Sequence, residues 1–547
     1  MFTQSWPFKI ILFSSLICVF YAQAAQPVNL VQSAMIQDLE VAKYNMSIKY
    51  APFEWKKELF GWDLENAFQK AKSRILNENP RTSKDYQKIF NQFLGSTQDY
   101  HVQTLYYSTA MSIFPMQVKG INGRYYFTDI ASNFSLESDH LAFFNINSDE
   151  FEEMIESFRG IQLGDEIIAI DDRPIREVIE ELIDENFNGD RTPTGYALAE
   201  RNLFLHRGKL GQEVPTGKFQ ITFLKEGNTQ SFNRTFQWLH VPEWIPNHLL
   251  KGQFEKEAAL TAAHLTNQNL SKDPIRTIDQ LLGRDFSVAI AKEMTPPKLL
   301  SRIKEVRGAI RPLERSEEED LREKGFLPPL GKILWESSKD KGIYAYLYRH
   351  PSKIKVGYLY LSSFNEVGEW AEEALNEIIA ALKAFNRKGA EALVVDITDN
   401  IGGNMTYMYA VLSILTDRPL KVPYHRELLI QEDILKAVLI YNYLKDVDLD
   451  QYENDKSTGD PATLSGYPLT RKVIEQVLNY SSTIMQTWES GNRLTPPLYL
   501  IGIDEVMPHP RCRYKKPILL LTNEYNFSCA DFFPAILQDN HRAKLFG

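Results

Sequence analysis

The first stretch of this sequence that could do chemistry surrounds Ser528. In residues 517–531 an apolar run typical of a buried strand is followed by a turn, by Ser528, and then by a helical pattern. A serine at a helix N-terminus lies beside unpaired backbone N–H groups and the positive end of the helix dipole, where a developing oxyanion can be stabilised. Serine is also a favoured N-cap residue, so position alone favours a capping role over a nucleophile.

A second stretch follows another apolar run, residues 392–397, and ends in the pair Gly402-Gly403. Two glycines let the backbone approach a substrate closely and point N–H groups into a cleft. The same pair would also serve a tight turn from strand to helix. The pair alone therefore leaves both interpretations open.

A third stretch holds Asp99 and His101, directly after a helical pattern. Histidine is the usual base for a serine nucleophile, because its proton dissociates near neutral pH. Any of the 10 histidines could instead be a packing residue. The sequence has no His-x-x-x-His, His-Glu-x-x-His or Cys-x-x-Cys spacing, so we expect neither a metal site nor a cofactor.

The elements around the first two stretches alternate between strand and helix. We expect strands at 356–361, 392–397 and 517–521, and helices at 370–385, 405–415 and 530–537. This alternation predicts a mostly parallel sheet with helices packed on it.

The N-terminal half follows other patterns. Residues 29–98 show helical spacing of apolar residues with a stop at 78–80, and β-type runs begin at 102–107 and 125–130. Residues 160–175 resemble the signature of PDZ domains, with Asp172 where that family usually has glycine. An amphipathic helix after this signature and a hairpin at 219–224 and 231–238 complete the expected PDZ-like domain. An unrelated β-hairpin with two glycines is the alternative.

Composition narrows the class of protein. The chain has 547 residues, which predicts about three or four domains. Its net charge of −10 argues against a nucleic-acid binder, and 44% hydrophobic with 24% charged residues is the ordinary globular mixture. The three cysteines exclude a disulfide scaffold, and Cys529 is expected to be a small buried residue.

The first residues have the pattern of a secretory signal. Lys9 precedes an apolar run at 10–21, and residues 22–24 supply the small residues of a cleavage site after Ala24. A membrane anchor is the alternative, but the run is shorter than the ~20 residues that cross a bilayer. We therefore expect no membrane anchor after cleavage. A glycan on the sequon at Asn526 would obstruct Ser528, which favours a bacterial exported protein.

Taken together, the three stretches resemble the tail-specific, or C-terminal processing, serine proteases. Further matching strings lie across most of the mature chain, at 50–52, 55–56, 61–64, 123–127, 325–328, 415–420 and 527–534. The resemblance implies a multidomain α/β protein with an N-terminal helical region, a PDZ-like β domain and a crotonase/ClpP-like ββα catalytic core. Its expected segments are the signal peptide (1–24), the helical region (25–100), the PDZ-like domain (101–245), a connector (246–345) and the catalytic core (346–547).

The resemblance also implies a role for each candidate residue. Ser528 would be the nucleophile, His101 the general base and then acid, and Asp99 a carboxylate behind it. Backbone N–H groups of Gly402 or Gly403, and of Cys529, would form the oxyanion hole. Protein or peptide substrates, a homodimer and secretion, into a host cell or alternatively the periplasm, are implied in the same way.

The resembled proteases add two further expectations. A protease of this kind that the sequence resembles is made as an inactive precursor and cuts itself within an internal segment. In this chain that segment would fall in the Pro-interrupted connector, where a plain linker is the alternative. The resembled proteases also take a catalytic glutamate from beyond the point at which this sequence stops, so we expect the catalytic core to be C-terminally incomplete.

Two other functions stay open at this stage. A non-catalytic peptide-binding protein would use the PDZ-like domain with a degenerate protease core. An acyl-transfer or hydratase enzyme on a crotonase-like core would need a coenzyme site, of which the sequence gives no sign.

Overall fold

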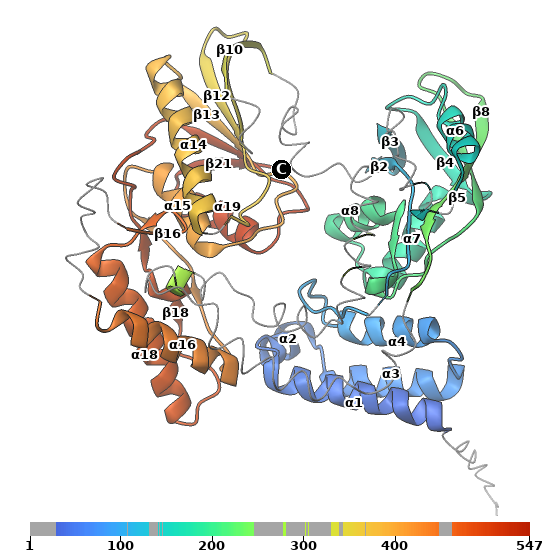
Figure 1. Ribbon diagram of the computed structural model, residues 1–547, viewed down its shortest axis with the longest axis horizontal. Coiled ribbons are helices and arrows are strands. Elements are labelled where there is room, and N and C mark those ends of the chain that lie inside the picture. Colours follow the sequence, from blue (N-terminus) through green and yellow to red (C-terminus); the bar gives the residue numbers. More distant parts are fainter. Residues whose placement is uncertain are drawn as a thin grey trace, which may run out of the picture.

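The computed structural model describes residues 29–106, 108–130, 146–244, 277–279, 330–337, 343–366, 368–447 and 462–547, with single residues at 141, 143, 144, 301 and 305. Figure 1 shows three bodies: the blue N-terminal helices, a green PDZ-like domain, and a yellow-to-red C-terminal body, which contains the expected catalytic core and is called the catalytic domain below. The predicted signal segment lies outside the described residues, as does most of the connector.

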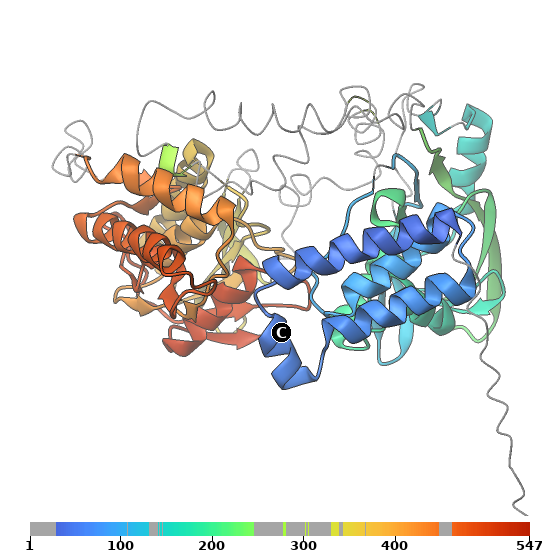
Figure 2. The same cartoon turned by 90° about the horizontal axis from the view of Figure 1, so that it is seen from below.

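The N-terminal region is helical, as predicted. Its helices are α1 (Leu30–Lys49), α2 (Phe53–Phe60), α3 (Leu64–Glu78) and α4 (Ser83–Gly95), and Figure 2 brings them to the front. The apolar faces of α1, α3 and α4 meet in one core that includes Leu39, Ile75 and Phe93. Asn79 takes a left-handed backbone (φ 48°) at the end of α3, which explains the stop at this position.

The PDZ-like domain contains a sheet in the order β2-β3-β4-β7-β8, with β5 paired to β4, and a small sheet in the order β6-β1-β9. Its elements are β1 (Met111–Ile113), β2 (Met116–Ile121), β3 (Arg124–Ile130), α6 (Ser148–Ser157), β4 (Glu166–Ile170), β5 (Arg173–Pro174), α7 (Ile175–Asn186), α8 (Pro193–Asn202), β6 (Leu205–Arg207), η1 (Gly208–Leu210), β7 (Lys218–Leu224), β8 (Ser231–Gln237) and β9 (Leu239–Val241). Phe114 packs against Phe219 and Phe236 in its core.

Two details of this domain bear on the sequence analysis. Asp171 and Asp172 both have positive φ (48° and 61°), and aspartate tolerates this conformation, so the turn forms without the usual glycine. The predicted strand at 102–107 is wrong over its described residues. The Tyr106 N–H donates to the Lys209 carbonyl (2.8 Å) in a loop contact, and 102–106 form no strand.

The catalytic domain is built on a sheet in the order β10-β11-β12-β13-β20-β21. Its elements are β10 (Lys332–Glu336), β11 (Tyr344–Arg349), β12 (Lys355–Tyr360), α14 (Gly368–Arg387), β13 (Ala392–Asp396), α15 (Met405–Ile414), β14 (Leu420–Lys421), β15 (Tyr424–His425), α16 (Gln431–Leu444), β16 (Thr463–Leu464), β17 (Tyr467–Pro468), α18 (Arg471–Glu489), β18 (Leu498–Tyr499), η3 (Leu500–Gly502), β19 (Glu505–Val506), β20 (Ile518–Leu521), α19 (Cys529–Asp539) and β21 (Ala543–Phe546). Strands β12, β13 and β20 are parallel, as predicted, and β21 joins β20 in the same direction, whereas β10 and β11 join antiparallel.

The register of the parallel strands decides where the candidate site lies. Asp396, the last residue of β13, pairs with Leu521, the last residue of β20. The loops after these two strands therefore leave the sheet at the same edge and level. One loop contains Gly402 and Gly403, and the other leads to Ser528.

Residues 277–279, which lie within the connector, are buried in the catalytic domain. Ile278 is 1% exposed and belongs to the main core of that domain. The Asp279 carboxylate accepts a hydrogen bond from the Ser465 hydroxyl (2.7 Å). At residues 277–279 the connector is thus packed rather than solvated.

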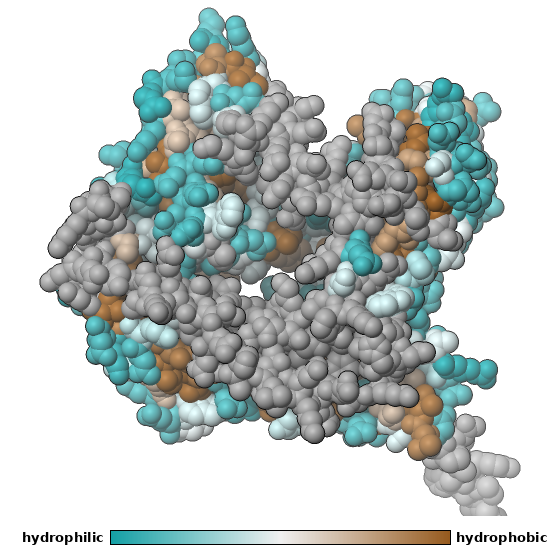
Figure 3. All heavy atoms as spheres, in the orientation of Figure 1, coloured by the Kyte–Doolittle hydropathy of each residue, from teal (hydrophilic) through white to brown (hydrophobic). Residues whose placement is uncertain are grey.

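The described surface in Figure 3 is mostly hydrophilic, with hydrophobic residues in separate patches. This agrees with a chain in which 24% of the residues are charged. Within the described residues, no helix combines the length and the apolar character needed to cross a bilayer.

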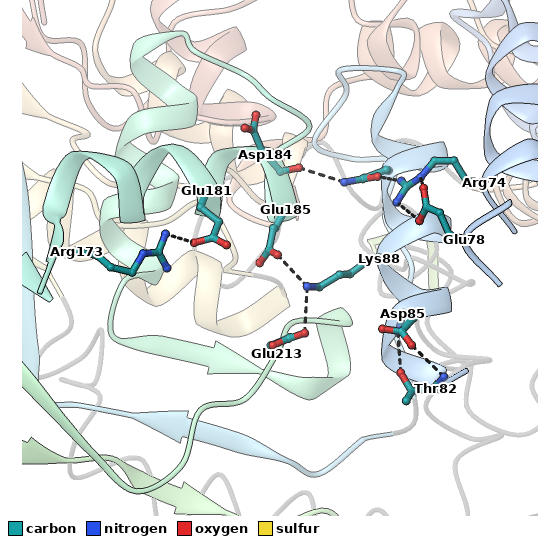
Figure 4. Close-up of polar contacts among 11 residues, drawn as sticks. Arg74, Glu78, Thr82, Asp85, Lys88, Arg173, Glu181, Asp184, Glu185 and Glu213 are labelled. Atoms are coloured by element: carbon teal, nitrogen blue, oxygen red, sulfur yellow. Dashed lines mark hydrogen bonds and ion pairs between the residues drawn. The ribbon is translucent and has the colours of Figure 1, made fainter. Parts of the chain in front are cut away.

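The helical region docks on the PDZ-like domain through polar contacts (Figure 4). The Lys88 ammonium lies 2.8 Å from the Glu185 carboxylate and 3.0 Å from that of Glu213. The Asn91 amide donates to the Leu210 carbonyl (2.8 Å). Such partly exposed ion pairs contribute little to stability. Together with the directional hydrogen bond from Asn91, they fix how the two bodies are oriented.

Candidate active site

Ser528 stands at a sharp turn between β20 and α19. Its backbone has φ 55° and ψ −123°, a conformation that residues other than glycine adopt at an energetic cost. Its side chain is exposed and makes no capping hydrogen bond, although it occupies the N-cap position. The Ser528 side chain therefore does not cap α19. A strained strand-to-helix turn that presents a serine hydroxyl is the geometry of a nucleophile elbow.

The glycine pair lies directly against this turn. Gly402 has φ 92°, and a Cβ placed on it would lie 2.5 Å from the Phe527 carbonyl oxygen, 2.8 Å from Ser528 Cβ and 2.9 Å from the Cys529 nitrogen. A Cβ on Gly403 would lie 2.2 Å from the carbonyl carbon of Phe364. Both positions therefore require glycine, for close approach as well as for backbone conformation.

The backbone N–H groups near Ser528 differ in what they contact. The Gly402 N–H donates to the Asn400 side-chain oxygen (2.9 Å), so it is already used. The N–H groups of Gly403 and Cys529 have no acceptor among the described residues. The buried Cys529 thiol donates to the Gly403 carbonyl (3.1 Å) and holds these two residues together. Burial raises the pKa of that thiol to about 11, which keeps it a donor at neutral pH.

Asparagine side chains connect the two loops, which the sequence analysis did not anticipate. The Asp399 N–H donates to the Asn523 side-chain oxygen (3.0 Å), and the Asn523 amide donates back to the Asp399 carboxylate (2.7 Å). The Asn526 amide donates to the carbonyls of Ile397 (2.5 Å) and Asn400 (3.2 Å). The signal in the sequence was the recurrence of asparagine after both strands.

His101 and Asp99 form a pair next to these loops. The His101 Nδ1 lies 3.5 Å from Asp99 Oδ1, and the His101 N–H donates to the same oxygen (3.0 Å). The His101 side chain is 69% exposed, and that of Asp99 is 23% exposed. The interaction of the His101 ring with the carboxylate lowers the pKa of Asp99 to about 2, and the same interaction raises the pKa of His101.

The residue between them ties the pair to the serine loop. The Tyr100 ring packs edge-on against the ring of Phe527, which precedes Ser528, with centroids 5.9 Å apart. The Tyr100 hydroxyl donates to Asp190 of the PDZ-like domain. No hydrogen bond joins His101 to Ser528 among the described contacts. The structure thus brings the two segments together without bonding the imidazole to the hydroxyl.

The PDZ-like domain also contacts the serine loop itself. Lys119 of β2 pairs with Glu524, and the Tyr525 hydroxyl donates to the Ala197 carbonyl in α8. The Arg201 guanidinium lies 5.2 Å from the centre of the Tyr525 ring. Residues 524 and 525, four and three positions before the candidate nucleophile, are therefore held by the PDZ-like domain.

Two further features of the chain concern its thiols and its possible metal ligands. Cys512 and Cys529 are both free and buried. In the parts of the chain that the structure describes, no group of three or more His, Cys, Asp or Glu side chains could hold a metal ion.

Comparison with known proteins defines the class. Residues 355–547 match the model of peptidase family S41, and residues 110–245 match a PDZ domain. A protein of Chlamydia pneumoniae is 31% identical over 545 residues, which cover 95% of this chain and 79% of that protein. One of Chlamydia trachomatis serovar D is 30% identical over 535 residues, covering 95% and 81%. The chain belongs to peptidase family S41 and is a serine protease of that family.

Within the family, the chain is similar to CPAF, the chlamydial protease-like activity factor. The solved structure of mature CPAF complexed with lactacystin is 26% identical, with a TM-score of 0.68 over 94% of this chain and 84% of that one. The structure of mature CPAF alone is also 26% identical, with a TM-score of 0.67 over 94% of this chain and 83% of that one. These matches confirm the resemblance seen in the sequence strings and the fold class of helical region, PDZ-like domain and protease core.

Proposed function

We propose that the protein is a secreted serine endopeptidase in which Ser528 attacks peptide bonds with His101 as its base. One observation carries this proposal. Ser528 stands at a strained turn, uncapped and exposed, beside two backbone N–H groups that have no acceptor among the described residues. Strain at such a position is retained where it serves function.

The proposed reaction uses groups that the site already presents. The Ser528 Oγ attacks the peptide carbonyl while His101 accepts its proton. The N–H groups of Gly403 and Cys529 stabilise the oxyanion, because the Gly402 N–H is used by Asn400. His101 then protonates the leaving amine, and water hydrolyses the acyl-enzyme by the same route. Asp99 holds the imidazole from behind. No metal or cofactor enters these steps.

The missing bond between His101 and Ser528 supports a second part of the proposal, that the chain is a self-processing zymogen. In an inactive precursor the base does not yet engage the nucleophile. The burial of residues 277–279 in the catalytic domain supports a role for the connector beyond that of a linker. Cleavage within the connector would then let the two groups approach.

The remaining parts of the proposal come from the sequence and the family. The segments are those expected above, from the helical region at 25–100 to the catalytic core at 346–547, except that β10 at the end of the expected connector belongs to the sheet of the catalytic domain. The PDZ-like domain docks a peptide chain or regulates access to the site. The protein acts on protein or peptide substrates as a homodimer after export, in a host cell or in the periplasm.

Labelling of Ser528 tests the proposed function. The full-length protein, before and after connector cleavage, is treated with a fluorophosphonate probe and assayed on an unstructured protein substrate. We expect the cleaved form to be labelled at Ser528 and to be active, and Ser528→Ala to lose both. Ser47→Ala, which removes an exposed hydroxyl bonded to its own helix, is the matched control.

Two results would contradict the proposal. Proteolysis that persists in Ser528→Ala would assign the activity to another nucleophile. A folded, cleaved protein that neither reacts with the probe nor cuts protein, yet binds peptides, would favour the non-catalytic peptide-binding alternative.

A further inference from the structure

The Asp99–His101 pair is held by a residue that the proposed mechanism does not use. Tyr50 follows the last residue of α1, and its hydroxyl donates to Asp99 Oδ2 at 3.0 Å. The other carboxylate oxygen, Oδ1, faces His101. The two oxygens of Asp99 therefore have different partners, and the one bonded to Tyr50 fixes the rotation of the carboxylate.

The contacts around Tyr50 separate its role from that of its neighbours. Lys56 donates to the Thr97 carbonyl (2.7 Å), and Trp62 donates to the Ser96 hydroxyl (3.1 Å). These two donors fix the chain just before Asp99, where Gln98 has a strained φ of 51°. Among these donors, Tyr50 alone bonds the carboxylate. Its ring is itself held by Trp62, with centroids 5.9 Å apart.

The helix that carries Tyr50 is anchored to the catalytic domain. Arg493 donates to the Ile48 carbonyl (2.8 Å) at the C-terminal end of α1, where a cation also complements the helix dipole. The position of the Tyr50 hydroxyl is thus set by the helical region and the catalytic domain together.

We infer that Tyr50 is a positioning residue, which orients Asp99 and through it sets the basicity of His101. The inference rests on the proposed function. Donation by Tyr50 withdraws charge from the carboxylate, and Asp99 in turn stabilises the imidazolium. Burial and the neighbouring Asp99 raise the pKa of the Tyr50 hydroxyl, so it remains a donor at every pH at which His101 titrates.

The groups that face this pair allow the sign of the effect to be worked out. Tyr50 and Lys56 approach from the helical region, while Tyr100 directs its hydroxyl to Asp190 of the PDZ-like domain. Removing the Tyr50 hydroxyl leaves Asp99 a stronger acceptor for protonated His101. The pKa of His101 then rises, and the acidic limb of the activity profile moves to higher pH.

The test compares Tyr50→Phe with Tyr86→Phe. Phenylalanine keeps the ring against Trp62 and removes only the hydroxyl. Tyr86 is a matched control, because its hydroxyl bonds the Met35 carbonyl (3.2 Å) and Asp38 (3.4 Å) in the same region without contacting Asp99. For Tyr50→Phe we expect the acidic limb of the pH profile of kcat/KM to move about half a unit to higher pH. We also expect kcat to fall about tenfold at unchanged KM.

The inference is overturned if the acidic limb of kcat/KM does not move in Tyr50→Phe, or if it moves equally in Tyr86→Phe. The proposed function does not fail with it, because the labelling of Ser528 tests that function separately. If Tyr50→Phe fails to fold, a fluorinated tyrosine at position 50, a stronger donor with the same ring, replaces it, and the limb must then move to lower pH. NMR titration of His101 in Ser528→Ala, with and without Tyr50→Phe, gives the same answer without activity.

Discussion

At the scale of single residues, the site depends on backbone conformations and close contacts that are sterically unfavourable for a residue with a Cβ atom. Ser528 holds a positive φ that costs about 1–3 kcal/mol in a residue other than glycine. Gly402 and Gly403 are pressed against neighbouring backbone so closely that a methyl group does not fit. The loop geometry, more than any one side chain, therefore brings two N–H groups to the serine.

Gly402→Ala tests this close approach. Its new Cβ would lie within 3 Å of three atoms around Ser528, so the serine turn must shift. We expect kcat to fall about 100-fold or more, as when an oxyanion donor is lost. Gly491→Ala is the control, because it has a similar positive φ (76°) with open space around it. Equal losses in both variants, measured on a fluorogenic peptide, would mean that strain and not contact matters.

Asp99→Asn tests the electrostatics of His101. The carboxylate raises the pKa of the imidazole, so activity in the native protein should fall, with decreasing pH, at a value above the usual ~6.5 of histidine. Asparagine removes the charge, and we expect the acidic limb of kcat/KM to move to lower pH, opposite to Tyr50→Phe. A limb that stays in place would show that His101 is not the titrating base.

At the scale of elements, two loops act as one unit because asparagine side chains join them. The parallel register of β13 and β20 brings the loops to one edge, and the reciprocal bonds of Asp399 and Asn523 then hold them together. The amide of Asn526 is likewise used by two carbonyls. A glycan at Asn526 would break these bonds as well as obstruct Ser528.

Asn523→Ala measures the connection between the loops. It removes two hydrogen bonds to Asp399 and leaves part-buried polar atoms unpaired, for which we expect a loss of about 1–3 kcal/mol in the free energy of unfolding. Urea denaturation gives the value. Asn492→Ala removes an exposed amide that donates to the Ser490 hydroxyl, and we expect it to change the free energy of unfolding by less than about 0.5 kcal/mol. Similar values for both variants would refute the proposed connection.

How far the sequence predicts this site follows from the range of each interaction. The strand–turn–helix around Ser528 and the Gly-Gly turn are local patterns, and the parallel sheet follows from their alternation. The bond from Tyr50 to Asp99 joins residues 49 positions apart, which periodicity does not report. The antiparallel pairing of β10 and β11 with β12 is local, and the sequence analysis did not name it. Helices α16 and α18, which pack on each other, are local elements of 14 and 19 residues that the sequence analysis also did not name.

At the scale of the whole molecule, the stretch 99–101 is the point at which three bodies meet. Asp99 is bonded by Tyr50 of the helical region, and Tyr100 contacts both Asp190 of the PDZ-like domain and Phe527 of the catalytic domain. The position of His101 therefore reports on the docking of all three. The connector adds a further contact, because Asp279 is bonded to Ser465.

Ser465→Ala tests the anchoring of the connector in the uncut chain. Loss of the bond to Asp279 should favour release of residues 277–279 by about 1 kcal/mol, which corresponds to about fivefold faster cleavage in the connector by trace trypsin. Ser352→Ala, in the exposed turn before β12, is the control. Equal cleavage rates in the two variants, measured by mass spectrometry of the fragments, would show that this bond does not anchor the connector.

The meeting of three bodies at residues 99–101 has a consequence for the cell that makes the protein. In the proposed mechanism the nucleophile and its base lie on separate bodies, so a nascent or misfolded chain is chemically silent even when its serine is intact. Peptide hydrolysis therefore occurs only in molecules whose three bodies are completely and correctly assembled. Quality control of this kind requires no inhibitor protein, because the active site does not exist until the molecule is finished.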